Sequence, residues 1–410
     1  MTRALLTRRG AAATIASAAL LLSPGSAQAA GVWSDADLSS LTNSPPAAGV
    51  PFGYSTNLTN QGPVGRVIYR TAAGGIQELS VSTSAGWRTA DLRAITGAPA
   101  PAAGILAAYT TDLTGQGPVA RVVYRTQASR IQELSVGSDG RWRSTDLTTL
   151  TGAPPAASAP YGYTTSLTGQ GPVGRVVYLT ANNRIQELSV TVAGGWHSAD
   201  LTALAGAPMG VSAPQAYTTN LAGQGPVGRV VYRTPANRIQ ELSVTVAGGW
   251  HSADLTAMAG APAAAGSPWG YTTSLNGQGP AARVVYRTAT GHIQELSAVN
   301  AAGGWHSADL TALTGAPAVQ DAVIVGYATR LSGDVPAARV VYRTAAGRIQ
   351  EISFGRTARW STADLSQITG APGASTPPAA FTTDLVGQGQ AARVVYVGSG
   401  GRVHEISCCS

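Results

Sequence analysis

Short segments of alternating apolar and polar residues, separated by Gly, Pro and Asn, fill the chain from residue 33 to residue 407. The clearest are RVVYLT at 175–180 and RIQELSV at 184–190, which are rich in the β-branched and aromatic residues typical of strands. In the first segment Val176 and Tyr178 point to one face and Val177 points to the other. The pattern therefore predicts hairpins in sheets that are buried on both faces.

This pattern recurs seven times, at intervals of 54 to 56 residues. Each unit reads W-x-x-A/T-D-L, a TGAP-type turn, GYTT, a GQGP-type turn, RVVYRT, a tight turn and RIQELSV, which makes four candidate strands. Repeated four-stranded units with two buried faces predict an all-β fold, a seven-bladed β-propeller with four short antiparallel strands per blade. An open solenoid would need polar capping repeats at its ends, and the sequence shows none.

The two ends of the repeated region differ in strand type. The region begins with a Trp-containing strand at 33–38 and ends with an RIQELS-type strand at 402–407. Either the N-terminal strand completes the last blade or every blade is contiguous in sequence, and the sequence leaves both arrangements open.

The tight turn between the last two apolar segments has a constant feature. Eight residues after the Arg of RVVYRT stands Gly, Asn or Ser, and Gly and Asn accept the left-handed backbone that a hairpin loop requires. We therefore expect a left-handed residue at each of Gly74, Ser129, Asn183, Asn237, Gly291, Gly347 and Gly401.

The N-terminal region differs from the rest in composition. Residues 1–29 contain a basic start, an apolar run at 11–22 and an A-x-A cleavage site at 27–29, the features of a secretory signal peptide. We therefore expect a secreted protein with a single β-propeller domain over 30–410. No later segment approaches the about 18 apolar residues of a transmembrane helix, so membrane insertion is not expected.

The charged residues exclude further classes of partner. All 27 basic residues are Arg, and they are spread along the repeats without forming a run, which argues against a nucleic-acid footprint. The two cysteines, Cys408 and Cys409, are adjacent near the end and are expected in a frayed tail or in an occasional intermolecular bond. No phosphate loop, nucleophile elbow or metal-ligand motif occurs, so no cofactor, metal or catalytic residue is predicted. The sequence carries no sign of the oligomeric state.

A Glu follows the Arg of every repeat by twelve residues. Across the predicted hairpin the two side chains lie diagonally on one face, within reach of each other. Such a pair can hold the hydroxyl groups of a sugar, or it can be an ion pair that ties the blades together, and the residues alone favour neither. The pairs are Arg66/Glu78, Arg121/Glu133, Arg175/Glu187, Arg229/Glu241, Arg283/Glu295, Arg339/Glu351 and Arg393/Glu405.

A Trp follows each of the first six Glu residues in sequence by nine or ten residues, and a seventh Trp stands in the equivalent segment at the start of the repeated region. Each indole can stack on the apolar face of a sugar ring or pack in the core between blades. These residues are Trp33, Trp87, Trp142, Trp196, Trp250, Trp305 and Trp360. The Asp four residues after each Trp is interpreted as a turn cap, and the Tyr three residues after each Arg as core. His197, His251 and His306 follow a Trp in three repeats only and are interpreted as surface variants.

The ungapped pattern R-V-x-Y/F, then G, I and E at eight, ten and twelve residues, followed by G-x-W or G-G-W, resembles the fungal and bacterial fucose-specific lectins. In that family, Arg and Glu hydrogen-bond fucose between adjacent propeller blades, and an aromatic residue of the neighbouring blade stacks on the sugar. The resemblance covers all seven repeats. It implies sites of Arg66, Glu78 and Trp142; Arg121, Glu133 and Trp196; Arg175, Glu187 and Trp250; Arg229, Glu241 and Trp305; Arg283, Glu295 and Trp360; Arg339, Glu351 and Trp33; and Arg393, Glu405 and Trp87.

Three functions follow from these alternatives. The first is a secreted multivalent lectin for fucose or fucosylated glycans, with cell-surface or free glycans as partners. The second is a non-catalytic scaffold for protein interactions, in which the Arg/Glu pairs are structural. The third, a glycoside hydrolase, is disfavoured because a hydrolase needs two carboxylates in different environments at one centre, whereas this sequence repeats a single Glu.

Overall fold

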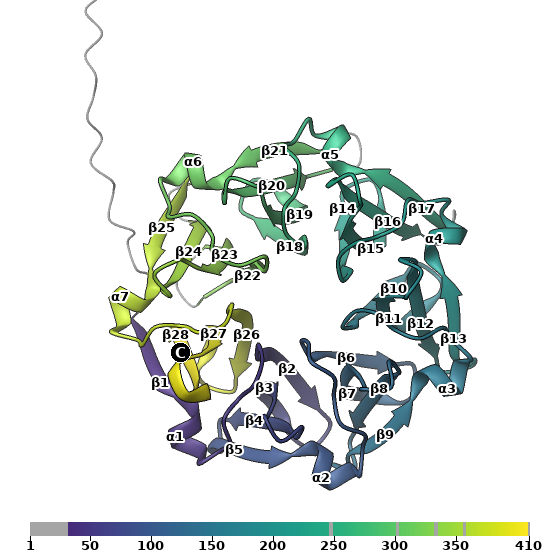
Figure 1. The fold of residues 1–410 in the computed structure, drawn as a ribbon, viewed down its shortest axis with the longest axis vertical. Helices are drawn as coiled ribbons and strands as arrows, with labels where there is room; N and C mark the ends of the chain where they lie inside the picture. Colours follow the sequence, from purple (N-terminus) through teal and green to yellow (C-terminus); the bar gives the residue numbers. More distant parts are fainter. Residues whose placement is uncertain (1–31, 246–248, 301–302, 332–334, 356–357, 409–410) are drawn as a thin grey trace, which may run out of the picture.

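The computed structural model describes residues 32–245, 249–300, 303–331, 335–355 and 358–408. Seven four-stranded antiparallel sheets stand around one axis like the blades of a propeller, as Figure 1 shows. The predicted fold class is therefore confirmed. The predicted signal peptide at 1–29 lies outside the described residues.

Each blade runs from an inner strand near the axis to an outer strand at the rim. Blade 1 contains β2 (Phe52–Leu58), β3 (Gly62–Arg70), β4 (Ile76–Ser82) and β5 (Ala85–Asp91); blade 2 contains β6 (Ala107–Leu113), β7 (Gly117–Arg125), β8 (Ile131–Val136) and β9 (Arg143–Asp146); blade 3 contains β10 (Tyr161–Leu167), β11 (Gly171–Leu179), β12 (Ile185–Thr191) and β13 (Gly195–Asp200). Blade 4 contains β14 (Gln215–Leu221), β15 (Gly225–Arg233), β16 (Ile239–Thr245) and β17 (Gly249–Asp254); blade 5 contains β18 (Trp269–Leu275), β19 (Gly279–Arg287), β20 (Ile293–Ala298) and β21 (His306–Asp309); blade 6 contains β22 (Val325–Thr329), β23 (Ala337–Arg343), β24 (Ile349–Phe354) and β25 (Trp360–Asp364).

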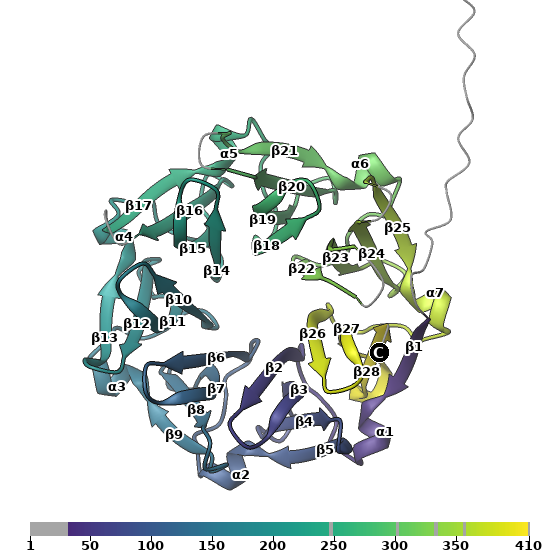
Figure 2. The same ribbon diagram turned by 180° about the vertical axis from the view of Figure 1, so that it is seen from behind.

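Blade 7 combines the two ends of the chain. It contains β26 (Ala379–Leu385), β27 (Gly389–Val397), β28 (Val403–Cys408) and, as its outer strand, β1 (Trp33–Asp37). The pairing runs from Trp33 opposite Cys408 to Asp37 opposite His404. Both views in Figures 1 and 2 show β1 beside β28, so the ring closes through the N-terminal strand. This decides between the two arrangements that the sequence leaves open.

Both faces of the middle strands are buried, as the apolar pattern predicts. Val176, Val177 and Tyr178 in β11 are all fully buried. The Tyr at this position is fully buried in every blade, and its hydroxyl donates a hydrogen bond to the carbonyl of a Pro in the preceding turn, for example Tyr178 to Pro154 at 2.7 Å. This confirms the interpretation of the recurring Tyr as core.

The hairpin turns also follow the sequence pattern. The seven residues expected to be left-handed have φ between 58° and 80°. In blade 3, Asn183 at φ 59° closes the turn, and beyond it Arg175 pairs with Ser189 and Val177 pairs with Glu187. This register places Arg175 and Glu187 diagonally on one face, as predicted.

A short helix follows the outer strand of each blade, where the sequence suggested only a turn. These helices are α1 (Leu38–Thr42), α2 (Leu92–Thr96), α3 (Leu147–Thr151), α4 (Leu201–Leu204), α5 (Leu255–Met258), α6 (Leu310–Thr314) and α7 (Leu365–Thr369); one 3₁₀ turn, η1 (Ser399–Gly401), lies in blade 7. The recurring Asp is the N-cap in all seven, as in Asp200, whose carboxylate accepts from the amide of Ala203 at 2.9 Å. The Asp is structural, as interpreted, but what it caps is a helix.

Adjacent blades approach closely near the axis. A Cβ atom at Gly162 of β10 would lie 2.1 Å from Cδ1 of Tyr109 in blade 2, so a larger residue at Gly162 would displace the Tyr109 ring. The Thr164 hydroxyl also donates to the carbonyl of Thr110 at 2.7 Å. One face of blade 3 is therefore packed against the Tyr109 face of blade 2, and the same order continues around the ring.

Three aromatic residues break the sevenfold repetition. Phe52, Tyr161 and Trp269 are the first residues of the inner strands of blades 1, 3 and 5. Tyr161 contacts Phe52 edge-on with 6.2 Å between ring centroids, and it contacts Trp269 in the same manner at 5.8 Å. Because these blades are not neighbours, the three rings connect alternate blades across the axis; we call them the aromatic trio.

The C-terminus is more ordered than the sequence suggested. Cys408 is the last residue of β28, is buried opposite Trp33 and Ala392, and is disulfide-bonded. The expectation of a frayed tail is therefore wrong for Cys408, because the strand extends to it; Cys409 lies outside the described residues. Within the described ranges, none of the helices has the length and apolar character needed to span a bilayer.

Candidate functional site

Every blade contains the predicted contact between Arg and Glu. The Nη1 atom of each Arg lies 2.6 or 2.7 Å from Oε1 of the Glu twelve residues later. The Arg comes from the second strand and the Glu from the third strand of the same sheet, as in Arg175 of β11 and Glu187 of β12. The ion pair thus ties two strands within one blade.

Two further side chains complete a network around each Arg. In blade 3, Nε of Arg175 donates to Oγ1 of Thr165 at 2.8 Å, and the hydroxyl of Tyr163 donates to Oε2 of Glu187 at 3.4 Å. Tyr163 pairs directly with Arg175 and so shares its face of the sheet. The Arg–Thr hydrogen bond recurs in all seven blades at 2.8 or 2.9 Å.

The GQGP-type turn supplies another partner. In blades 1, 4 and 5 the second terminal nitrogen of the Arg donates to a Gln side chain of that turn: Arg66 to Gln61 at 3.1 Å, Arg229 to Gln224 at 2.8 Å and Arg283 to Gln278 at 3.3 Å. In these blades the turn therefore contacts the Arg of the ion pair through its Gln side chain.

Sequence reasoning identified the Arg and the Glu but missed the Thr, Tyr and Gln. A signal was present, because these residues recur ten, twelve and five positions before the Arg. The GYTT segment was interpreted only as a strand and GQGP only as a turn, since their contacts with the Arg depend on the register between strands.

The network is buried in each blade. The Arg side chains are 5 to 9% exposed and those of the Glu residues are 3 to 5% exposed. Burial raises the pKa of Glu187, and the Arg175 charge opposes that rise. Burial alone would lower the pKa of Arg175, but the Glu187 carboxylate outweighs it and the pKa lies above its usual value. In each blade the Glu carboxylate therefore compensates the charge of a buried guanidinium, which would otherwise be costly to keep away from water.

The predicted Trp of the next blade faces the Arg at six of the seven interfaces. The guanidinium carbon lies 5.7 to 5.9 Å from the indole centroid, within the range of a cation–π contact. The pairs are Arg121/Trp196, Arg175/Trp250, Arg229/Trp305, Arg283/Trp360, Arg339/Trp33 and Arg393/Trp87. Trp33 is buried, and the other repeat tryptophans are half-buried.

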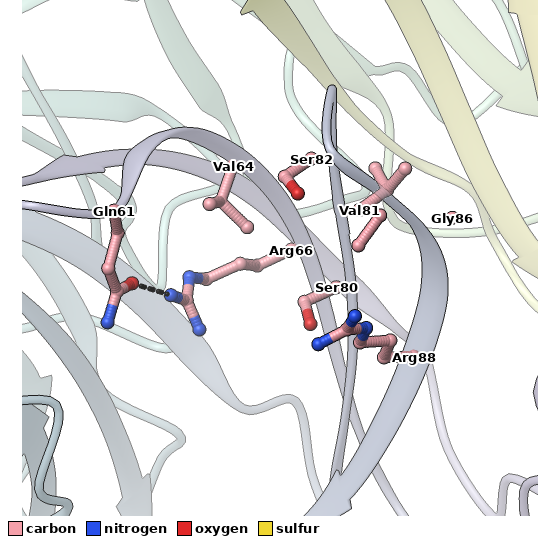
Figure 3. Close-up of a pocket in the computed structure, with 9 residues that line it drawn as sticks. Gln61, Val64, Arg66, Ser80, Val81, Ser82, Gly86 and Arg88 are labelled. Atoms are coloured by element: carbon pink, nitrogen blue, oxygen red, sulfur yellow. Dashed lines mark hydrogen bonds between the residues drawn. The ribbon is translucent and has the colours of Figure 1, made fainter.

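The interface after blade 1 is different. Although Arg66 and Trp142 are both among the described residues, no cation–π contact joins them. Trp142 lies just before β9 and packs against the core of blades 1 and 2. Arg66 instead lines a pocket of about 240 Å³ that is formed by residues of blade 1, as Figure 3 shows.

Two blades depart from the network in their hydrogen bonds. Blade 7 has Phe381 where the other six blades have the Tyr, and Oε2 of Glu405 is buried without a hydrogen-bond partner in the described structure. In blade 2 the Tyr is present, yet the hydroxyl of Tyr109 and Oε2 of Glu133 are both without a partner. The ion pair itself is unchanged in both blades.

The arrangement presents groups of the kind that bind a polyol. Among the described residues, no group of three His, Cys, Asp or Glu side chains is placed to hold a metal ion. Six interfaces combine guanidinium donors, a carboxylate, hydroxyl groups and an indole, which are the groups that bind sugar hydroxyls and the apolar face of a sugar ring.

Known structures share this architecture. The BP39L lectin from Burkholderia pseudomallei is similar with a TM-score of 0.64 and 14% identity, over 89% of this chain and 97% of that chain. AofleA from Arthrobotrys oligospora has a TM-score of 0.52 and 15% identity, over 81% and 89% of the two chains. A fucose-specific lectin from Aleuria aurantia has a TM-score of 0.52 and 18% identity, over 78% and 96%. Identities this low establish the shared fold alone.

The sequence comparisons bear on the family. A search of curated proteins found no match. Residues 173–371, from β11 in blade 3 to the end of blade 6, match the model of the fungal fucose-specific lectins. This match supports a carbohydrate-binding lectin over an enzyme. It confirms the resemblance inferred from the repeated motif: the chain is similar to the fucose-specific lectin family.

Proposed function

We propose that this chain is a secreted multivalent lectin that binds fucose or fucosylated glycans between adjacent blades. The observation that carries the proposal is the meeting of Arg and Glu from one blade with Trp from the next at six interfaces, at 5.7 to 5.9 Å between guanidinium carbon and indole centroid. The family match over residues 173–371 supports the same ligand class.

The chemistry of the interface fits a sugar ring. Guanidinium and carboxylate groups offer fixed donors and acceptors for hydroxyl groups and the ring oxygen, and an indole packs against C–H groups. Such a site would bind a monosaccharide with a dissociation constant of about 1 mM to about 1 µM. Several sites on one rigid ring would then gain avidity on a surface that displays many glycans.

A glycan array followed by titration calorimetry with a fucoside tests the proposal. In the double variant Arg175→Met/Glu187→Leu both charges of blade 3 are removed together, so no buried charge is left unpaired. We expect this variant to fold and to bind fewer equivalents of fucoside than the native chain. The matched control is Arg184→Met in the same blade, whose pair with Asp200 lies at the rim with 35% of the Arg side chain exposed.

Two results would overturn the proposal: no binding to any fucosylated glycan, or the same stoichiometry in the double variant as in the native chain. The second result would favour the scaffold, for which the deep burial of the Arg/Glu pairs is the supporting observation. Under the scaffold alternative the double variant changes stability but no glycan binding.

Export is a separate part of the proposal. We expect cleavage after Ala29, which leaves β1 intact to close blade 7. N-terminal sequencing of the protein recovered from the culture medium checks this. A chain retained in the cytoplasm with its first 29 residues would contradict it.

A further inference from the structure

A row of three paired residues crosses the outer part of each blade, on the face that carries the buried Arg. Directly paired residues of neighbouring strands share a face, so the row can be read from the register. Its first member is the Arg and its second is always Ser, but its third member varies. In order of blades the third members are Arg88, Arg143, His197, His251, His306, Ser361 and Ser34.

Only blades 1 and 2 have Arg at this position, and the two arginines differ in their surroundings. Arg143 is held by Asp139: Nη2 lies 2.5 Å from Oδ2, and Nη1 donates to Oδ1 at 3.2 Å. Within the described part of the chain, the Arg88 side chain makes no hydrogen bond or ion pair. Blade 1 therefore carries an exposed, uncompensated guanidinium beside the buried ion pair of Arg66 and Glu78.

A pocket lies between Arg66 and Arg88. The register between β4 and β5 shifts at Ser80 and Ser82, and such a bulge re-aims side chains at the edge of a sheet. The pocket of about 240 Å³ is lined by Gln61, Val64, Arg66, Ser80, Val81, Ser82, Ala85, Gly86 and Arg88. Figure 3 shows both arginine side chains in this pocket, with Ser80 between them. The guanidinium of Arg66 donates a hydrogen bond to the side-chain oxygen of Gln61.

The charge of the lining is one-sided. None of its nine residues is acidic, and the charge of Arg66 is compensated by Glu78 beneath it. Arg88 leaves a net positive charge next to two serine hydroxyls and a glutamine amide. A guanidinium with neighbouring hydroxyl donors matches the oxygens of a carboxylate or a sulfate.

We propose that the pocket between Arg66 and Arg88 binds the acidic substituent of a glycan, a carboxylate or a sulfate ester, and that blade 1 thereby selects acidic glycans. This inference rests on the proposed lectin function and names the substrate class of one of its sites. The other interfaces bear a paired Arg, a His or a Ser at the third position of the row, so the proposal assigns them no acidic preference.

The test compares Arg88→Ser with Arg143→Ser. Serine already occupies this position in blades 6 and 7, so both variants keep a residue that the fold accepts. The probes are one neutral fucosylated glycan, its sialylated form and its sulfated form, measured on an array and by calorimetry. We expect one site per native chain, in blade 1, to bind an acidic form about tenfold more tightly than the neutral glycan, a difference of about 1.4 kcal/mol.

Arg88→Ser is expected to lose this preference and to keep its binding to the neutral glycan, whereas Arg143→Ser keeps both. Raising the ionic strength from about 0.1 M to about 1 M shortens the Debye length from about 10 Å to about 3 Å and should weaken the preference in the native chain. The sialylated and sulfated probes separate a carboxylate from a sulfate as the preferred group.

The remaining outcomes are equally decisive. A preference that survives in Arg88→Ser, or that disappears equally in Arg143→Ser, overturns the assignment to this pocket. Neutral binding without any acidic preference in the native chain overturns this inference and leaves the lectin proposal standing. If the native chain binds neither the neutral nor the acidic glycan, both the lectin proposal and this inference are overturned. If acidic glycans bind through Arg88 whether or not they contain fucose, only the assignment of fucose as the ligand is overturned.

Discussion

The inner and outer parts of the blades differ in how strictly they repeat. Near the axis, the Arg, Thr and Glu contacts are the same in all seven blades to within 0.1 Å between donor and acceptor, as in the Arg–Glu distances of 2.6 or 2.7 Å. At the rim, the third position of the row changes from Arg to His to Ser. The difference follows burial: a charge without solvent needs its partner, whereas an exposed residue can change freely.

The comparison separates the residues that build the ring from those that can distinguish its sites. Arg175 and Glu187 are 6% and 3% exposed, so changing either alters the blade itself. His197 is exposed on the same face and only two strands away. Residues at the rim can therefore differ between blades without changing the buried part that folds.

The largest expected effect comes from breaking one inner pair. Arg175→Met leaves the Glu187 carboxylate buried without its cation, which should lower the free energy of unfolding by about 3 to 5 kcal/mol. Adding Glu187→Leu should restore most of this loss. Urea unfolding of the single and double variants measures both values, and equal stability of Arg175→Met and the native chain would contradict the buried-pair account.

A smaller effect is expected from exchanging the Tyr and Phe of two blades. Tyr271 donates to Oε2 of Glu295 at 3.2 Å, so Tyr271→Phe should lower stability near neutral pH by about 1 to 2 kcal/mol. Phe381→Tyr in blade 7 should raise stability near neutral pH, because the new hydroxyl supplies a hydrogen-bond donor to Glu405. Urea unfolding tests this: the change in the free energy of unfolding should be negative for Tyr271→Phe and positive for Phe381→Tyr.

The Phe381→Tyr variant should also change the pH dependence. Burial raises the pKa of Glu405, with Arg393 opposing the rise. A carboxyl group with a raised folded-state pKa favours folding at low pH, and this contribution is lost as pH rises from the unfolded-state value of about 4.3 through the folded-state pKa. A tyrosine donor stabilises the ionised form, so Phe381→Tyr should lose less stability across that interval. Unfolding curves at a series of pH values test the sign.

The contact between blades is expected to be weaker than either inner change. Trp250→Phe keeps an aromatic ring over Arg175 but provides a poorer cation–π surface, so stability should fall by about 0.5 to 1 kcal/mol. If the indole also stacks on a sugar, fucoside binding by calorimetry should weaken at one site. A loss of several kcal/mol would place Trp250 among the core residues instead.

The smallest effect is expected at the rim. His197→Ser copies blades 6 and 7 and should change the free energy of unfolding by less than about 0.5 kcal/mol. Thermal unfolding of His197→Ser and Tyr271→Phe, each compared with the native chain, measures the difference between a rim change and an inner change. A larger loss would show that the rim also helps to build the blade.

Much of this fold could be predicted from the repeat itself. The left-handed turn residue fixed the hairpin register, and from that register the diagonal placement of Arg175 and Glu187 followed. The approach of Arg175 to Trp250 was anticipated from the family resemblance, and the structure places these residues 5.8 Å apart. Whether a sugar binds there remains a prediction.

Other features depended on contacts between segments that the repeat does not specify. The hydrogen bond from Arg175 to Thr165 arises from the pairing of β10 with β11, which no local pattern fixed. The significance of Arg88 appears only when its row is compared with that of Arg143 and its partner Asp139. The closure of the ring by β1 could not be predicted either, because it depends on the pairing of β1 with β28, which lie at opposite ends of the repeated region.

The aromatic trio has a consequence for how such a chain reaches its native order. Near-identical repeats can pair with the wrong neighbours during folding, and misassembly is a characteristic failure of repeat proteins. Phe52, Tyr161 and Trp269 differ from one another in shape, and Trp269 also donates to the carbonyl of Gly326 at 2.9 Å. Their mutual contacts form only when blades 1, 3 and 5 occupy their proper places, so the trio distinguishes the correct cyclic order from exchanged or domain-swapped ones.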